Sequence, residues 1–137
     1  MMVRDECIDE TMNEWPSQWF GKSKEAAIRG PKILQSMCEL WRLIEQEKLS
    51  DPERELHFRA LWVMGFELSR DALLSRHLPK LPVRGRIRSM VEDAGPLLFA
   101  FYTEQEEDQF AHCCQTFERV LRRSGLWDEY SQAFSRN

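Results

Sequence analysis

Basic side chains are concentrated in one short segment, residues 76–88 (RHLPKLPVRGRIR). It holds five lysines or arginines and one histidine but no acidic residue, although the whole chain has a formal net charge of −4. Local positive charge in a segment interrupted by Pro79, Pro82 and Gly85 favours contact with an anion. That anion would be an acidic protein surface or, as the alternative, a nucleic-acid phosphate backbone.

Three arginines of this segment, Arg84, Arg86 and Arg88, alternate along the chain. In extended backbone, which Pro82 favours, they would share one face, whereas on a helix they would spread over about 200°. Each guanidinium can bind a carboxylate or a phosphate through two hydrogen bonds. The competing interpretation is that these arginines neutralise the chain's own acidic segments, residues 5–14 and 104–108. Basic residues near the C-terminus would extend the same face if the two segments pack together. The candidate partner- or anion-binding residues are Arg76, Lys80, Arg84, Arg86, Arg88, Arg119, Arg122 and Arg123.

Aromatic residues near the two ends of the chain form a second candidate surface. Terminal elements of a small domain are hard to bury completely, so one cluster can serve as an exposed apolar anchor for a partner. The alternative, which we favour slightly, is that both clusters pack inward and close the core. The candidate interface residues are Trp15, Trp19, Phe20, Trp127 and Tyr130.

The histidines and cysteines contain no recognisable metal-binding motif. His112, Cys113 and Cys114 are consecutive, so on a helix their side chains would point about 100° apart and could not converge on one ion. His57 and His77 lie on other segments, and spacing alone cannot tell whether they meet His112. We therefore predict no metal and no cofactor. Without a secretory signal, we expect reduced, core-filling thiols at Cys7, Cys38, Cys113 and Cys114.

Motifs of common enzyme classes are absent from the chain. It has no GxSxG nucleophile turn, no HExxH zinc motif and no glycine-rich phosphate loop. Most of the 23 acidic residues fall on predicted outer helix faces or at helix starts, where solvated structural roles are common. We predict that the protein is not an enzyme.

Helical periodicity dominates the sequence and positions these candidate residues. Two capping boxes, Ser50–Glu53 (SDPE) and Thr103–Glu106 (TEQE), mark helix starts, and Gly125 marks a helix end. The helix after Ser50 is apolar on more than one face and is expected to be central, with Gly65 at a close helix crossing. The predicted helices cover residues 5–15, 31–49, 51–78 (bent near residue 69), 83–93, 103–124 and 126–134. A turn is predicted between Pro16 and Gly21, and a short turn capped by Ser23 is predicted to end at Gly30.

These elements predict one all-α domain, residues 1–137, folded as an irregular bundle of five to seven helices. The hydrophobic content of 42% and the small net charge exclude a disordered chain. The richest apolar run, residues 96–102, is too short to cross a bilayer, so no membrane contact is expected. We predict a non-enzymatic adaptor, inhibitor or small accessory subunit in the bacterial cytoplasm, which docks on an acidic partner protein. The alternative is a nucleic-acid-binding regulator or a small subunit of a nucleoprotein complex; self-association as a homodimer is a further option.

Overall fold

The computed structural model describes residues 10–21, 24–74, 83–92 and 103–130, without the side chains of residue 25 and residues 71–74. Every regular element in these ranges is a helix, which confirms the predicted all-α fold class. None of the helices there is long and apolar enough to span a membrane. The elements are a 3-10 helix, η1 (Glu10–Glu14), and the α-helices α1 (Trp15–Phe20), α2 (Lys24–Ile28), α3 (Gly30–Glu45), α4 (Asp51–Leu74), α5 (Val83–Glu92) and α6 (Glu104–Ser124); residues 127–130 are again helical.

The predicted capping signals begin and end the helices as expected. At the start of α4, the Ser50 hydroxyl accepts a hydrogen bond from the Glu53 amide at 3.4 Å. At the start of α6, Thr103 Oγ1 accepts from the Glu106 amide at 3.0 Å, and Glu106 Oε1 accepts from the Thr103 amide at 2.8 Å. The end of α6 is Gly125, whose φ of 85° is the left-handed conformation that glycine adopts without strain.

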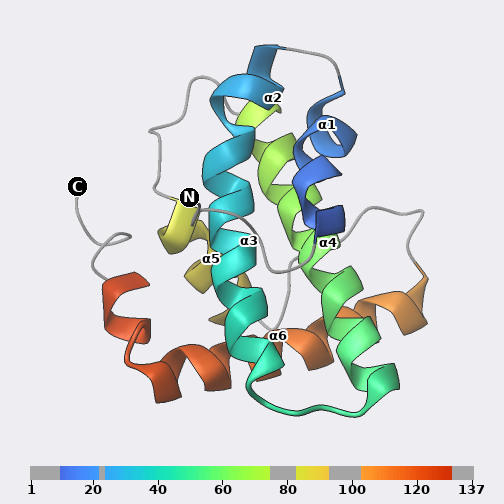
Figure 1. The fold of residues 1–137 in the computed structure, drawn as a ribbon, viewed down its shortest axis with the longest axis vertical. Coiled ribbons are helices and arrows are strands. Elements are labelled where there is room, and N and C mark those ends of the chain that lie inside the picture. The colour runs from blue at the N-terminus through green and yellow to red at the C-terminus, as the bar shows by residue number, and fades with distance from the viewer. Residues whose placement is uncertain (1–9, 22–23, 75–82, 93–102, 131–137) are drawn as a thin grey trace.

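Helices α3 and α4 lie side by side, and α6 crosses them near the end of α3 and the beginning of α4 (Figure 1). Helix α1 packs against both α3 and α4, and α5 packs against α6. The buried side chains form one hydrophobic core between these helices, with Trp41, Met64, Phe117 and Leu121 among its most enclosed members. This arrangement brings the first turns of α4 against the middle of α6, where the candidate site lies.

Gly65 confirms the expectation of a close crossing on α4. The indole ring of Trp19 in α1 lies directly over it, so a Cβ atom at this position would overlap the ring. Trp19 is fixed there by a 3.1 Å hydrogen bond from its Nε1 to the Trp62 carbonyl oxygen. A glycine is therefore required because an aromatic side chain occupies the space of its missing Cβ.

Three local predictions were wrong. A turn was expected between Pro16 and Gly21, but residues 16–20 belong to helix α1, because Pro16 sits in its first turn, where the missing N–H costs no hydrogen bond. Helix α3 ends at Glu45 rather than Leu49, and Lys48 in the connection has a left-handed φ of 58°. Cys38 is disulfide-bonded instead of reduced, whereas Cys113 and Cys114 are free thiols as predicted.

Candidate metal centre

The arginines of the basic segment do not form an extended row. Arg84, Arg86 and Arg88 lie on helix α5, so the hydrogen-bonded helix spreads them around its axis; Arg76 and Lys80 lie outside the described residues. The Arg84 guanidinium donates to Glu39 at 2.8 Å and to Glu129 at 3.1 Å. It also lies 5.1 Å from the centre of the Tyr130 ring.

Arg88 is engaged in the same way, against the chain beyond α6. Its guanidinium donates to Glu92 and to the Trp127 carbonyl oxygen, both at 3.1 Å, and lies 4.1 Å from the centre of the Trp127 ring. Arg122 lies 4.5 Å from the centre of the same indole, so two cations flank Trp127. Such contacts stabilise the cations without any external anion.

The remaining candidate arginines also have internal partners. Arg122 pairs with Glu118 at 2.9 Å, and Arg119 and Arg123 both pair with Glu47, in the connection after α3. Arg86 is not without a partner either. We call the set Arg84, Arg88, Arg119, Arg122 and Arg123, with its acidic and aromatic partners, the arginine network. Internal neutralisation agrees with the competing interpretation of the sequence, but the acidic partners are Glu39, Glu47, Glu92, Glu118 and Glu129 instead of the expected segments 5–14 and 104–108.

The candidate interface aromatics are not exposed. The side chains of Trp15, Trp19, Phe20 and Trp127 are between 4% and 7% exposed, and Tyr130 is completely buried. The interpretation of either cluster as an exposed anchor is therefore wrong. The rings of α1 are buried because this helix packs against α3 and α4. Trp127 and Tyr130, in the chain after α6, are buried against α5 and α3.

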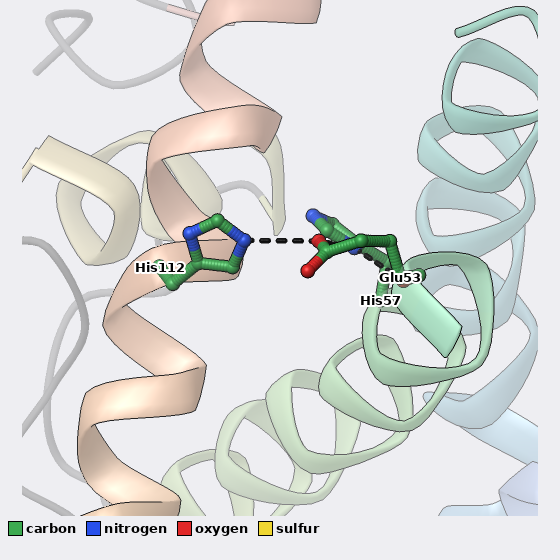
Figure 2. A group of neighbouring side chains, drawn as sticks. All are labelled: Glu53, His57 and His112. Carbon is green, nitrogen blue, oxygen red and sulfur yellow. Dashed lines mark hydrogen bonds and ion pairs between the residues drawn. The ribbon is translucent and has the colours of Figure 1, made fainter. Parts of the chain in front are cut away.

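The structure brings together a different set of chemically capable side chains. Glu53 and His57 lie one turn apart on α4, and His112 faces them from α6 (Figure 2). One potential ligand atom from each residue lies within 4.8 Å of the other two. His112 Nε2 is 3.0 Å from Glu53 Oε1, and His57 Nδ1 is 3.8 Å from the same oxygen. We call Glu53, His57 and His112 the three-residue group.

His57 is oriented by the backbone of its own helix. Its Nδ1 lies 2.7 Å from the carbonyl oxygen of Glu53, which can only accept, so Nδ1 carries the proton and Nε2 carries a lone pair. The side chain is fully buried, and Nε2 has no hydrogen-bond partner. An unpartnered buried acceptor costs about 1–3 kcal/mol. Burial also lowers the pKa of His57, because it penalises the charged imidazolium, so the ring is held in its neutral form.

The other two members of the group are open to solvent. The side chains of Glu53 and His112 are 43% and 51% exposed. The hydrogen bond from His112 lowers the pKa of the Glu53 carboxyl group and keeps it ionised. The group thus combines a neutral imidazole, a carboxylate and a second imidazole, with access from solvent on one side.

A cavity of about 110 Å³ lies next to this group, between α4 and α6. Leu56 and Cys113, the chain neighbours of His57 and His112, are part of its wall. Burial raises the pKa of Cys113 to about 12 and also raises that of Cys114. Both thiols therefore remain protonated at neutral pH, where they are poor nucleophiles and poor metal ligands.

The three-residue group was not predicted from the sequence. The spacing of Glu53 and His57, i and i+4 on a strongly predicted helix, was a readable signal for two ligands on one face. His112 was considered only with Cys113 and Cys114, because its partner across the helix crossing depends on how α4 and α6 pack.

Comparisons with known proteins identify no relative: no protein-family model, no curated protein and no solved structure matches the chain.

Proposed function

We propose that this protein is a non-enzymatic binding protein whose ligand is a divalent transition-metal ion, held by Glu53, His57 and His112. Two observations carry the proposal: His57 Nε2 is buried and has no hydrogen-bond partner, and ligand atoms of His57, Glu53 and His112 all lie within 4.8 Å of one another. A metal ion would use the lone pair of His57 Nε2 and offset the cost of burying it.

The donor set selects the class of ion. Two imidazole nitrogens and one carboxylate oxygen suit borderline ions such as Zn²⁺, whereas Mg²⁺ and Ca²⁺ prefer oxygen ligands throughout. The hydrogen bond from His57 Nδ1 to the Glu53 carbonyl oxygen is the kind of outer contact that orients a metal-binding imidazole. His112 Nε2 donates to Glu53 Oε1 in the metal-free protein, so metal binding would require the imidazole proton to move to Nδ1, which leaves a lone pair on Nε2 for the ion.

Binding is favoured over catalysis in this proposal. The cysteine beside the group, Cys113, is held in its thiol form and offers no activated nucleophile. The hypotheses of docking on an acidic protein or on nucleic acid relied on free arginines and exposed aromatic rings, and the described members of both sets are paired or buried within the protein. A cytoplasmic location remains a proposal, which fractionation of cells that produce the protein would test.

The proposal is tested by titrating the metal-free protein with Zn²⁺ and measuring the heat of binding. We expect one zinc ion per chain, and each of Glu53→Gln, His57→Gln and His112→Gln should weaken binding about 100-fold or more, because each removes a direct ligand. Glu55→Gln, an exposed position on the same helix, is the matched control and should bind zinc as the unaltered protein does.

Circular dichroism of each variant separates loss of ligand from loss of fold. A folded His57→Gln protein that binds zinc as tightly as the unaltered chain would overturn the proposal, because zinc would then sit on surface groups alone. The proposal is also overturned if the unaltered protein binds no zinc, or if Glu55→Gln weakens binding as much as the ligand variants.

A further inference from the structure

The cavity between α4 and α6 has walls of mixed character. Most of its lining is apolar, but one cation, one anion and one amide also face it. The lining residues are Leu56, Arg59, Ala60, Val63, Glu106, Gln109, Phe110 and Cys113. None of the three-residue group is among them, so the cavity is a separate feature of the same helix crossing.

Arg59 differs from the other arginines that the structure describes. Arg54, Arg70 and the five arginines of the arginine network make ion pairs, and Arg29, Arg42 and Arg86 also have partners. Within the described ranges, Arg59 has no hydrogen bond, ion pair or aromatic contact. Arg59 is exposed and lines the cavity, so its guanidinium is open to pair with an anionic group of a ligand bound there.

Glu106 supplies the opposite charge on the same wall. One of its oxygens accepts the Thr103 amide of the capping box, which fixes the carboxylate at the start of α6. It makes no ion pair with Arg59, although both residues line the cavity. The two charges are thus held apart, with the Gln109 amide and the apolar side chains completing the wall. A ligand that complements this wall carries a negative and a positive group on a small apolar body.

We propose that the cavity binds a small aliphatic zwitterion of the amino-acid type. Its carboxylate would pair with Arg59 and its ammonium group with Glu106, while its side chain would contact Ala60, Val63 and Phe110. A simple carboxylate would be repelled by Glu106, and a simple amine by Arg59. A volume of about 110 Å³ corresponds to roughly four water molecules. It therefore accommodates an aliphatic chain of three or four carbons and excludes large aromatic side chains.

Three compounds that differ by one charged group test this proposal: norvaline, pentanoate, which lacks the ammonium group, and butylamine, which lacks the carboxylate. Each is titrated into metal-free protein, and amide chemical shifts are followed by NMR. Metal-free protein is used because amino acids chelate metals, and because the result then does not depend on the zinc proposal. We expect norvaline to bind with a Kd of about 1 mM and to shift residues of the cavity wall. Pentanoate and butylamine should each bind about tenfold more weakly.

Two charge-removing variants assign the groups. Arg59→Gln should abolish the preference for norvaline over butylamine, and Glu106→Gln should abolish the preference over pentanoate. Glutamine preserves the capping box at Glu106, so α6 keeps its start signal. Glu107→Gln, one residue further on and not part of the wall, should keep both preferences. The proposal is overturned if norvaline causes no shift at roughly 20 mM, if the three compounds bind equally, or if neither variant changes the preferences.

Discussion

Helix α6 contributes to two regions that differ in whether their polar and charged side chains have partners within the protein. Its C-terminal half carries Arg119, Arg122 and Arg123, which belong to the arginine network, where the guanidinium groups meet carboxylates or aromatic rings. Its N-terminal half carries His112 and faces α4, where the buried Nε2 of His57 has no partner and Arg59 is unpaired. The charged side chains in the C-terminal half of α6 therefore have partners, whereas groups that face its N-terminal half do not.

The difference teaches that charge density is a poor guide to function. The basic segment is the most prominent charged feature of the sequence, yet its described arginines stabilise the fold. The groups proposed to bind ligands are less conspicuous in the sequence: His57, whose buried Nε2 has no partner, and Arg59, an exposed arginine without an ion pair. Since buried polar groups are almost always paired in native proteins, the exceptions are better pointers to a ligand than the charges themselves.

The largest contrast between the two regions is expected from reversing one arginine in each. Arg84→Glu would place a third carboxylate beside Glu39 and Glu129 and should lower the free energy of unfolding by about 2 kcal/mol. Arg59→Glu removes no internal contact and should change it by about 0.5 kcal/mol or less. Urea denaturation of both proteins measures the two effects. Equal losses of unfolding free energy in the two variants would show that Arg59 stabilises the fold as Arg84 does.

A smaller contrast is expected from removing a polar group while keeping an apolar side chain. His57→Leu deletes the unpartnered Nε2 acceptor but also the hydrogen bond from Nδ1 to the Glu53 carbonyl oxygen. These two contributions oppose one another, so the stability of the metal-free protein should change by about 0.5 kcal/mol or less. Tyr130→Phe deletes a hydroxyl that donates to Glu39 at 2.7 Å and should lower stability by about 1 kcal/mol.

In thermal or urea denaturation, no loss of stability in His57→Leu beside a clear loss in Tyr130→Phe would support the view that His57 serves ligand binding rather than stability. If His57→Leu destabilises the metal-free protein as Tyr130→Phe does, the imidazole is a structural group, and the metal proposal loses its main support.

Local signals in the sequence were sufficient for most of the fold. The capping boxes at Ser50 and Thr103 and the glycine at position 125 act within one turn of chain, and each was confirmed. Gly65 was also correctly interpreted, because a glycine inside an apolar helix is costly unless another element packs against it. The end of α3 at Glu45 was not predicted, because it is set by the conformation of the connection that follows the helix.

The candidate site depends on packing, which spacing does not reveal. Glu53 and His57 share a helix face by periodicity alone, but His112 is 59 residues away from Glu53 and meets it only because α6 crosses α4. The arginine network failed to be predicted for the same reason. Arg84 and its partner Glu39 are 45 residues apart, and nothing local indicates that they meet.

The smallest expected effect is the pH dependence of the unfolding free energy, which should originate from the buried His57. Burial lowers the pKa of His57 below its ordinary value of 6.5, with Glu53, His112 and Arg119 acting on it as nearby charges. The unfolded chain therefore binds a proton as the pH falls through 6.5 while the folded chain does not, and stability declines below that pH. Glu53 adds a loss of stability at lower pH, because its pKa is also lowered and its stabilising contribution disappears as the carboxylate is protonated.

The unfolding free energy of metal-free protein should therefore decrease between about pH 7 and 5 in the unaltered chain and in Tyr130→Phe. In His57→Leu it should change little over the same range. If the unfolding free energy of His57→Leu still falls as the pH is lowered, the acid sensitivity does not come from His57. The α4–α6 crossing and the arginine network would then not differ in their response to acid.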